Sequence, residues 1–292
     1  MMQVSFQNSP REFLQKCGPY LEQHAAEHNL ILTLCQNAAQ KQARGEKADI
    51  RFSTLFNDND LVIAAVQTPP ANLVLSKSSQ PDIEVLAETL ANHNFQFPGI
   101  IGPSDVASIF SNKWTQLTGQ KSVEYMDQII YTLRKVVPPR PVEGEMRLAR
   151  VEESPLIAEW IYAFAKDALP KAEHIKSEDA PAKATDLIKN GRVMVWAVNG
   201  KPVAKASGGG TETFARIGGV YTPPEHRGHG YASALVAQLS QLRLDQGKKM
   251  CCLYADARNP VSNSIYRKIG YEFVGRSSLY VLDKDDLNSR QA

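Results

Sequence analysis

The stretch that most constrains the fold of this chain is YTPPEHRGHGYASALVAQL, residues 221–239. Two prolines end the strand-like run TFARIGGVYT, two glycines follow, and from Tyr231 apolar residues recur at helical spacing. The first amides of a helix have no partner inside the helix and lie at the positive end of its dipole. Glycines allow an anion to approach those amides closely, and Arg227 adds a permanent positive charge. The stretch therefore predicts a turn that binds a pyrophosphate.

Two common phosphate-binding motifs fit this turn poorly. A P-loop requires Gly-Lys-Ser/Thr, and no lysine follows Gly230. The Rossmann dinucleotide fingerprint requires a third glycine where this chain has Ser233, and Pro223 and Pro224 interrupt its usual passage from strand to loop. Both interpretations are therefore disfavoured.

Residues 227–232, RGHGYA, match the pattern Arg/Gln-x-x-Gly-x-Gly/Ala, and the turn resembles the acyl-CoA motif of the GNAT superfamily of N-acetyltransferases. In the later run NPVSNSIYRKIGY, Asn259 is followed by Tyr266 and then by Gly270-Tyr271, a spacing that is also common in that superfamily. The expected order over residues 145–282, β-α-α-β-β-β-α-β-α-β, is similar too. The resemblance covers the second half and implies an α/β fold of the mixed-sheet, α+β kind.

The resemblance implies acetyl-CoA as the co-substrate. The backbone from Val220 to Thr222, with Tyr221 between them, would contact the pantetheine arm. Asn259 would lie near the pantetheine, and Tyr266 would donate a proton to the departing thiolate as general acid. The pyrophosphate would be held by the residues of the turn and the first helical turn: Arg227, Gly228, His229, Gly230, Tyr231, Ala232 and Ser233.

The general base is left open by the sequence. Many members of the superfamily carry a glutamate on the strand before the motif, and here the nearest carboxylate is Glu212, at the start of that strand. Asp256, at the end of a later strand, and Glu173, in the loop between two helices, are alternatives. The backbone amide of Val220 is a candidate for polarising the thioester carbonyl.

The proline-rich segment KVVPPRPVEGEMR, residues 135–147, predicts a border near residue 141, with domains 1–140 and 141–292. The first half is expected to contain helices over residues 13–25, 30–39, 81–94 and 103–119, and strands within residues 60–76, 97–102 and 127–136. This order partly echoes the second half, which suggests a degenerate GNAT-like repeat. Pro98–Phe110 would stand where the motif was lost. Two roles remain open for the first half: a wall of the acceptor cleft, or a homodimer interface.

In the second half we expect Ser154 to cap a helix, Asn199-Gly200 to form a hairpin turn, and Ser207–Gly210 to form a flexible hairpin connection. Asn259 is also expected to cap its helix, whatever else it does, and Gly270 to end it. Tyr231–Gln246 should be the helix that follows the motif.

A metal site is not expected. The run HAAEH, residues 24–28, matches the inverted zinc-peptidase pattern H-x-x-E-H, but short patterns of this kind arise by chance on polar helix faces. The four cysteines form no C-x-x-C pair. The net charge of +2 gives no basic field for nucleic acid, and no apolar run reaches the roughly 20 residues of a membrane helix. With no signal peptide visible, we expect a cytoplasmic protein that binds neither membrane nor nucleic acid.

The leading hypothesis is an acetyl-CoA-dependent N-acetyltransferase in which a primary amine attacks the thioester directly. The amine could belong to a small metabolite, an amino acid, an antibiotic or a protein. The alternative is an acyl-CoA-binding regulatory or scaffolding protein without turnover, because no general base stands out. Acceptor specificity is expected to come from Ala165–Ala180 and the first domain.

Overall fold

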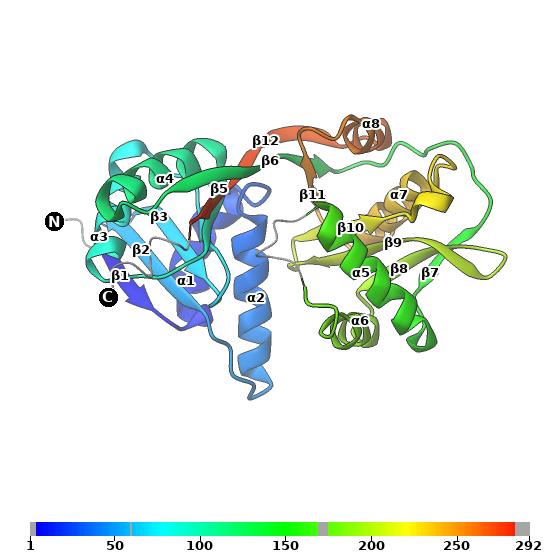
Figure 1. The fold of residues 1–292 in the computed structure, drawn as a ribbon, viewed down its shortest axis with the longest axis horizontal. Coiled ribbons are helices and arrows are strands. Elements are labelled where there is room, and N and C mark those ends of the chain that lie inside the picture. The colour runs from blue at the N-terminus through cyan, green and yellow to red at the C-terminus, as the bar shows by residue number, and fades with distance from the viewer. Residues whose placement is uncertain (1–3, 59, 169–174, 284–292) are drawn as a thin grey trace. The chain divides into compact units, whose positions relative to one another are not determined.

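The computed structural model describes residues 4–58, 60–168 and 175–283 and divides the chain into two compact units. The first unit comprises Met1–Ile130, Asp256–Arg258 and Val274–Ala292, and the second comprises Tyr131–Ala255 and Asn259–Phe273. Each unit is a sheet with helices packed against it (Figure 1).

The first unit has a mixed sheet with the strand order β1-β2-β3-β4-β5-β12. Its strand pairs are antiparallel except β4–β5, which is parallel. Its elements are β1 (Val4–Gln7), α1 (Pro10–Gln23), α2 (Asn29–Ala43), β2 (Arg51–Asn57), β3 (Asp60–Gln67), β4 (Leu73–Leu75), α3 (Gln80–Asn92), β5 (Gly99–Pro103), α4 (Ser104–Thr118), β6 (Ser122–Leu133) and β12 (Glu272–Leu282), the last two having residues in both units.

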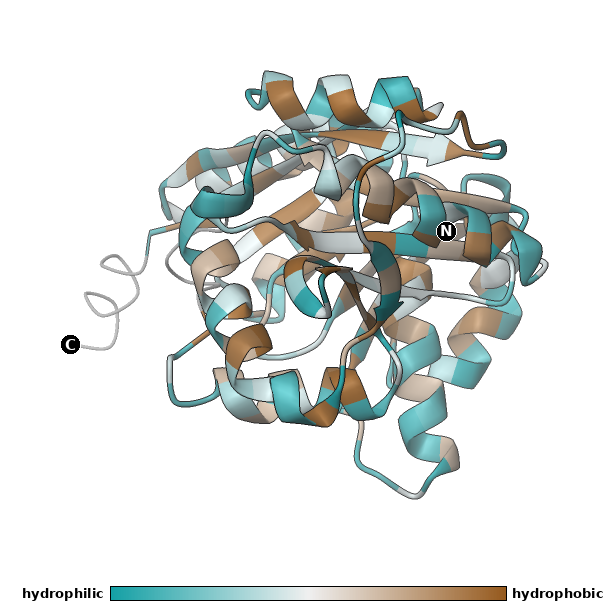
Figure 2. Ribbon diagram, turned by 90° about the vertical axis from the view of Figure 1, so that its right-hand side faces the viewer, coloured by the Kyte–Doolittle hydropathy of each residue, from teal (hydrophilic) through white to brown (hydrophobic). Residues whose placement is uncertain are grey.

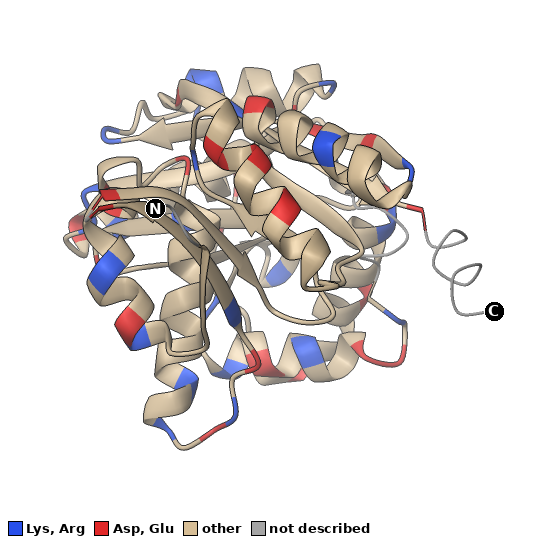
Figure 3. Ribbon diagram, turned by 90° about the vertical axis from the view of Figure 1, so that its left-hand side faces the viewer, with Lys and Arg blue, Asp and Glu red and all other residues tan. Residues whose placement is uncertain are grey.

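Helices cover both faces of this first sheet. On one face, buried residues of α3 and α4, such as Leu86 and Phe110, form a core with Leu55 and other sheet residues. On the opposite face Phe13 of α1 stacks on Phe52 of β2, with ring centroids 4.2 Å apart. Figure 2 shows apolar and polar residues alternating along helices of the chain, as expected for amphipathic helices. In Figure 3, acidic and basic residues are interspersed along the helices of the face shown.

The second unit has the strand order β6-β11-β10-β9-β8-β7, in which β6 contributes its last residues. The pairs β7–β8, β8–β9 and β9–β10 are antiparallel, and β10–β11 is parallel. Its elements are β7 (Glu145–Leu148), α5 (Ser154–Ala168), α6 (Ala180–Lys189), β8 (Val193–Val198), β9 (Lys201–Gly210), β10 (Phe214–Tyr221), α7 (Tyr231–Asp245), β11 (Met250–Asp256) and α8 (Pro260–Ile269). Residues of α5, α6 and β8, including Ile157, Ala184 and Val195, form its core on one face.

The two halves of the chain repeat one order of elements. From β1 to β6 the order is β-α-α-β-β-β-α-β-α-β, and from β7 to β12 it is the same. The repeat expected from the sequence is thus present, but the place given to its lost motif was wrong. The counterpart of the β10–α7 turn is the β4–α3 connection, Ser76–Ser79, whereas Pro98–Phe110 corresponds to β11–α8.

The last strand of the chain belongs to the first unit. Residues Ser277 to Val281 of β12 pair antiparallel with Pro103 to Gly99 of β5, and Leu282 is buried in the core with α3 and α4. Conversely, Tyr131–Leu133 of β6 belong to the second unit. The two compact units are therefore not separated by one border in the sequence near residue 141. The division into domains 1–140 and 141–292 stays a prediction.

Three local expectations differ from the structure. The strands β1 and β2 were not expected, because VSFQ is short and RFSTLFN does not alternate. Ser154 does not cap α5: a 3₁₀ turn, Val151–Glu153, leads into the helix, and Glu153 accepts a hydrogen bond from the Arg150 amide. Ser207–Gly210 is the paired end of β9, not a flexible connection.

Candidate functional site

The turn between β10 and α7 has the backbone that an anion site requires. Gly228 and Gly230 both have φ of +83°, a left-handed conformation that glycine adopts without a side-chain clash. Gly230 is the N-cap of α7, and no side chain caps the helix. The amides of Tyr231, Ala232 and Ser233 therefore begin the helix without a capping side chain, at the positive end of its dipole.

Arg227 is held beside this turn. Its Nε donates to the carbonyl oxygen of Thr222 at 3.0 Å, and a terminal guanidinium nitrogen lies 3.9 Å from a carboxylate oxygen of Asp167 in α5. The side chain is 55% exposed, so the guanidinium remains available to an anion. His229 stacks on Tyr231 with centroids 5.4 Å apart and lies on the exposed side of the turn.

Strands β10 and β11 stop pairing before either strand ends. Their pairing runs from Phe214↔Met250 to Arg216↔Cys252, whereas β10 continues to Tyr221 and β11 to Asp256. On the other edge of β10 the register with β9 shifts between Gly218 and Tyr221, and Gly219 has φ of +55°. A bulge of this kind re-aims the backbone, here at the residues on either side of Val220.

A buried lysine lies under the bulge. Lys205 of β9 is 2% exposed, and its Nζ donates to the Gly219 carbonyl oxygen at 2.8 Å. The ammonium also lies 5.6 Å from the centroid of the Phe164 ring. Burial, followed by repulsion from Lys183, lowers the pKa of Lys205 from 10.5 to about 7. Sequence analysis missed this residue, although strand alternation with buried Val203 was a signal for it.

Tyr266 of α8 belongs to a buried cluster of three tyrosines. Its ring lies 6.2 Å from Tyr131 and 5.9 Å from Tyr271, measured between centroids. The hydroxyl of Tyr131 donates to Asn263 and that of Tyr271 pairs with Ser240, but the Tyr266 hydroxyl has no partner among the described residues. Burial raises the pKa of Tyr266 to about 12, so the phenol stays protonated at neutral pH.

Asn259 acts as a helix cap. Its Oδ1 accepts a hydrogen bond from the Ser262 amide at 3.1 Å, and Gly270 ends α8 in the left-handed conformation. Both local expectations are confirmed. Of the residues predicted to contact pantetheine, Thr222 has its carbonyl oxygen engaged by Arg227, while its Oγ1 is buried without a partner.

None of the three base candidates gains support. Glu212 lies in the turn that precedes β10, roughly 20 Å along the strand from Gly219 at about 3.3 Å per residue. The Asp256 carboxylate accepts hydrogen bonds from the amide and guanidinium of Arg258. Glu173 lies outside the described residues, as does much of the Ala165–Ala180 loop.

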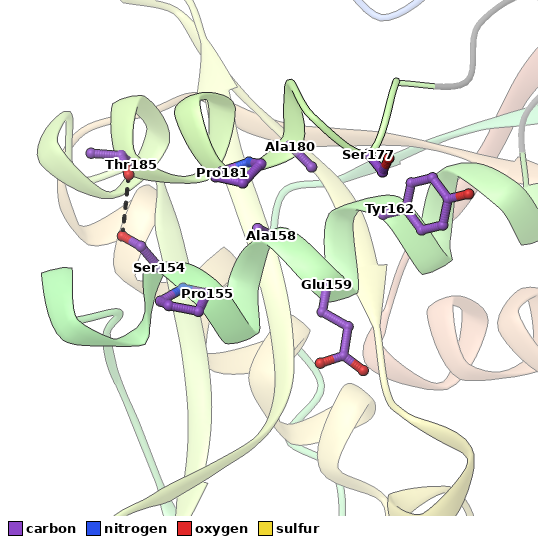
Figure 4. Close-up of a pocket in the computed structure, with 9 residues that line it drawn as sticks. All are labelled: Ser154, Pro155, Ala158, Glu159, Tyr162, Ser177, Ala180, Pro181 and Thr185. Carbon is purple, nitrogen blue, oxygen red and sulfur yellow. Dashed lines mark hydrogen bonds between the residues drawn. The ribbon is translucent and has the colours of Figure 1, made fainter.

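A separate cavity of about 550 Å³ lies between α5 and α6. Figure 4 shows Ser154 and Thr185 facing each other across it and the Glu159 carboxylate turned away from α6. The cavity is lined by Ser154, Pro155, Ala158, Glu159, Tyr162, Ser177, Ala180, Pro181 and Thr185. None of these is a predicted cofactor-binding residue.

The H-x-x-E-H run in the first unit is structural. His28 is 1% exposed: its Nδ1 pairs with the Leu21 carbonyl oxygen, and its Nε2 accepts from the Lys77 amide. Burial lowers the pKa of His28 to about 4. Glu27 pairs with the Lys77 ammonium at 2.9 Å. These contacts hold the β4–α3 connection, which is the counterpart of the glycine turn, so both nitrogens of His28 are engaged away from any metal.

The fold and the glycine turn define the class of protein. A model of the family described as FR47-like protein matches residues 197–281, from the end of β8 to all but the last residue of β12, including the turn. Together with the solved structures below, this shows that the chain has the fold of the GNAT acetyltransferases. The resemblance expected from the sequence is confirmed.

Several solved structures share this fold over almost the whole chain. An acetyltransferase of the GNAT family from Colwellia psychrerythraea has 12% identity and a TM-score of 0.58, with 97% of this chain and 100% of that chain covered. A Drosophila protein has 16% identity and a TM-score of 0.68, over 96% and 98%. A tandem GNAT protein from the clavulanic acid biosynthesis pathway has 12% identity and a TM-score of 0.55, also over 96% and 98%.

A search among curated proteins found no match. Within residues 4–58, 60–168 and 175–283, no helix is both long enough and apolar enough to span a membrane. The same residues contain no cluster of three or more His, Cys, Asp or Glu suited to a metal ion.

Proposed function

We propose that the protein is an acetyl-CoA-dependent N-acetyltransferase whose site lies in the second unit. The observation that carries this proposal is the combination at β10: the strand separates from β11 beside a bulge and then leads into a left-handed glycine turn before an uncapped helix. A long ligand with a pyrophosphate at one end and a reactive group at the other fits that combination.

Each residue then has a defined task. The amides of Tyr231, Ala232 and Ser233, with Arg227, bind the pyrophosphate, and Val220 and Thr222 offer backbone groups to the pantetheine. The Val220 amide donates to the thioester oxygen, where negative charge develops. Asn259 keeps its capping role and contacts the cofactor from the start of α8.

The transfer needs the amine to lose a proton and the departing sulfur to be stabilised. The neutral amine forms a bond to the acetyl carbon, the carbon–sulfur bond breaks, and the electron pair leaves on sulfur. Tyr266 donates to that sulfur. With a pKa of about 12, above the roughly 8.5 of an ordinary thiol, the phenol stabilises the thiolate chiefly as a hydrogen-bond donor. The proton lost by the amine passes to water.

Cofactor binding is tested by thermal stabilisation with acetyl-CoA. A ligand at 100 times its Kd stabilises by about 2.7 kcal/mol, which corresponds to several degrees in Tm. Arg227→Ala combined with Gly230→Asp should abolish the shift, because it removes one cation and places a carboxylate at the helix N-terminus. Arg44→Ala, which alters an exposed ion pair with Glu46, is the control. An unchanged shift in the double variant would refute the assignment.

Turnover is tested by release of CoA with a panel of primary amines. Tyr266→Phe should lower the rate about 100-fold, as expected for loss of a hydrogen bond to the developing thiolate, and leave the Kd for acetyl-CoA within a factor of about two. Stabilisation by acetyl-CoA with no CoA release from any amine would favour the alternative, an acyl-CoA-binding protein without turnover. Equal rates for the wild type and Tyr266→Phe would exclude Tyr266 as the donor to the departing sulfur.

A further inference from the structure

The face of the second sheet that carries Lys205 also carries other cations. Directly opposite residues of an antiparallel pair share a face. Lys205 contacts Phe164 of α5, and it pairs with Tyr221, which contacts Trp160 of the same helix. Ser207 and Gly209, which follow Lys205 by alternation, therefore lie on this α5 face, as do their partners Gly218 and Arg216.

Three cations surround a small patch of this face. Arg216 lies on β10 itself. Arg192 donates from Nε to the Gly208 carbonyl oxygen, and its Nη2 lies where a side chain on Gly209 would begin, 2.9 Å from the ideal Cβ position. Lys205 completes the set from beneath the bulge. Two of the residues between them, Gly209 and Gly218, have no side chain.

These cations lack the acidic partners that buried or half-buried charges usually have. Within the described part of the chain, no carboxylate lies within 4.0 Å of Lys205, Arg192 or Arg216. The Nε of Arg216 is buried without a hydrogen-bond partner, and its guanidinium lies 5.3 Å from the centroid of the Tyr254 ring. The acids Asp167 and Glu159 of α5 lie toward the Tyr221 end of the strand instead. Burial is the largest cause of the raised pKa of Tyr221, and both carboxylates raise it further.

The space over Gly218, between Lys205 and Arg216, is open. A Cβ on Gly218 would meet no atom within 4 Å, and Ser207, Gly209 and Gly218 are all partly exposed. Arg216 is the last residue of β10 paired with β11, and it precedes Gly218 by roughly 7 Å along the strand. The bulge at Gly219 follows directly. If the amine of an acceptor lies at the bulge, Arg216 can therefore contact another group of the same acceptor that is a few bonds from the amine.

We propose that this α5-face patch binds the carboxylate of the acceptor, so that the substrate is an amino acid, with Arg216 as the principal anchor. The inference rests on the proposed acetyl transfer at the bulge. A guanidinium lying against a ring presents its N–H edge in a plane, which suits the two oxygens of a carboxylate. The lack of a side chain on Gly218 leaves room for the backbone of the acceptor.

The test compares matched amines with and without a carboxylate: glycine with methylamine, and phenylalanine with phenethylamine. O-phosphoethanolamine separates a carboxylate site from a general anion site. We expect kcat/KM for the amino acid to exceed that for its partner at least tenfold. Arg216→Gln should reduce this preference at least tenfold, and Arg216→Lys should restore part of it. Arg243→Gln is the matched control, because Arg243 of α7 lies against Gly208 on the opposite face.

Binding measurements keep the inference separate from the proposed function. With CoA bound, glycine or phenylalanine should raise Tm in the wild type and not in Arg216→Gln, and this requires no transfer. If acetyl-CoA binds and neutral amines are acetylated as well as amino acids, the inference is wrong and the function stands. If neither acetyl-CoA binding nor CoA release occurs, the function is wrong. If the amino acid raises Tm equally in the wild type and in Arg216→Gln, Arg216 is not the carboxylate anchor. A higher kcat/KM for O-phosphoethanolamine than for the amino acid would also overturn the assignment of a carboxylate site.

Discussion

At the scale of single residues, Lys205 is the least expected group in the second unit. A lysine that is 2% exposed usually has a carboxylate beside it, and this one has a carbonyl oxygen and an aromatic ring. Its pKa of about 7 lies below the 10.5 of an unfolded lysine. Between these two values the unfolded chain holds the proton more often than the folded chain. Stability therefore rises with pH across that window, and the full cost of the buried charge is present below pH 7.

Replacement of this lysine by Lys205→Met should remove that dependence. The Tm difference, variant minus wild type, should be more positive at pH 6 than at pH 9.5, because only the wild type becomes more stable as Lys205 loses its proton. Calorimetry across pH 5.5–9.5 measures it, with Lys201→Met, an exposed lysine of the same strand, as control. Parallel wild-type and variant curves would show that Lys205 does not titrate in this range.

The sequence was most informative about residues with local roles. The cap at Asn259 and the helix stop at Gly270 depend on neighbours within a few positions, so they could be predicted from spacing alone. Lys205 and Arg216 depend on strand pairing, and Arg216 acquires its surroundings from β9 and β11. For Arg216 no local pattern distinguishes such a cation from an ordinary exposed one, and for Lys205 the only local signal is its alternation with buried Val203.

At the scale of elements, the bulge in β10 allows one strand to meet two structural requirements. The strand must pair with β9 and also aim its later residues away from β11, and Gly219 with φ of +55° makes the change of direction. The Lys205 ammonium then fixes the peptide that follows. The bulge was missed because IGGV reads as a strand with two glycines, and the period of two gives no sign of a shifted register.

Gly219→Ala should destabilise the unliganded protein by about 1–2 kcal/mol, since an alanine in the left-handed region is strained. Its Cβ would also lie 3.4 Å from the Lys205 Nζ and 3.6 Å from the Ser207 Oγ. Gly218→Ala is the matched control: its Cβ meets nothing within 4 Å and its φ is not positive, so Tm should change little. The comparison is made by thermal unfolding without ligand. A larger loss at Gly218 would contradict the assignment of the bulge to Gly219.

Periodicity predicted most helices and the strands of the second half, because their apolar faces repeat regularly. It failed for β2, where Ser53 and Thr54 are buried beside Phe52 and Leu55 and alternation is lost. The prediction that β5–α4 is the counterpart of the glycine turn was also wrong. The two halves align, with β4–α3 as the counterpart, only when β2 is included in the order of elements.

At the scale of the whole molecule, two copies of one topology exchange strands at their ends. Residues 274–282 complete the sheet of the first unit, and Tyr131–Leu133 belong to the second. The sequence could indicate that a strand ends the chain, because its apolar residues alternate. It could not name the partner of that strand, since pairing between distant segments leaves no periodic trace.

A fragment of residues 1–140 should therefore fail to fold as a native unit. It retains β5 but loses its pairing with β12 and the buried Leu282, so an edge of the sheet and part of the core are exposed. We expect no cooperative thermal transition for the fragment alone, and recovery of one when a peptide of residues 272–283 is added. Circular dichroism and amide NMR dispersion measure both. A well-dispersed spectrum from the fragment alone would argue that β12 is dispensable.

The place of β12 has a consequence for synthesis on the ribosome. The first unit emerges early, but its last strand emerges only after the entire second unit has been translated. During that interval the edge of β5 lacks its partner and is open to chaperones or to unwanted pairing. A nascent chain that stops before β12 leaves the sheet of the first unit without the partner of β5. The order of strands thus makes translation as far as β12 a condition for the first unit to mature.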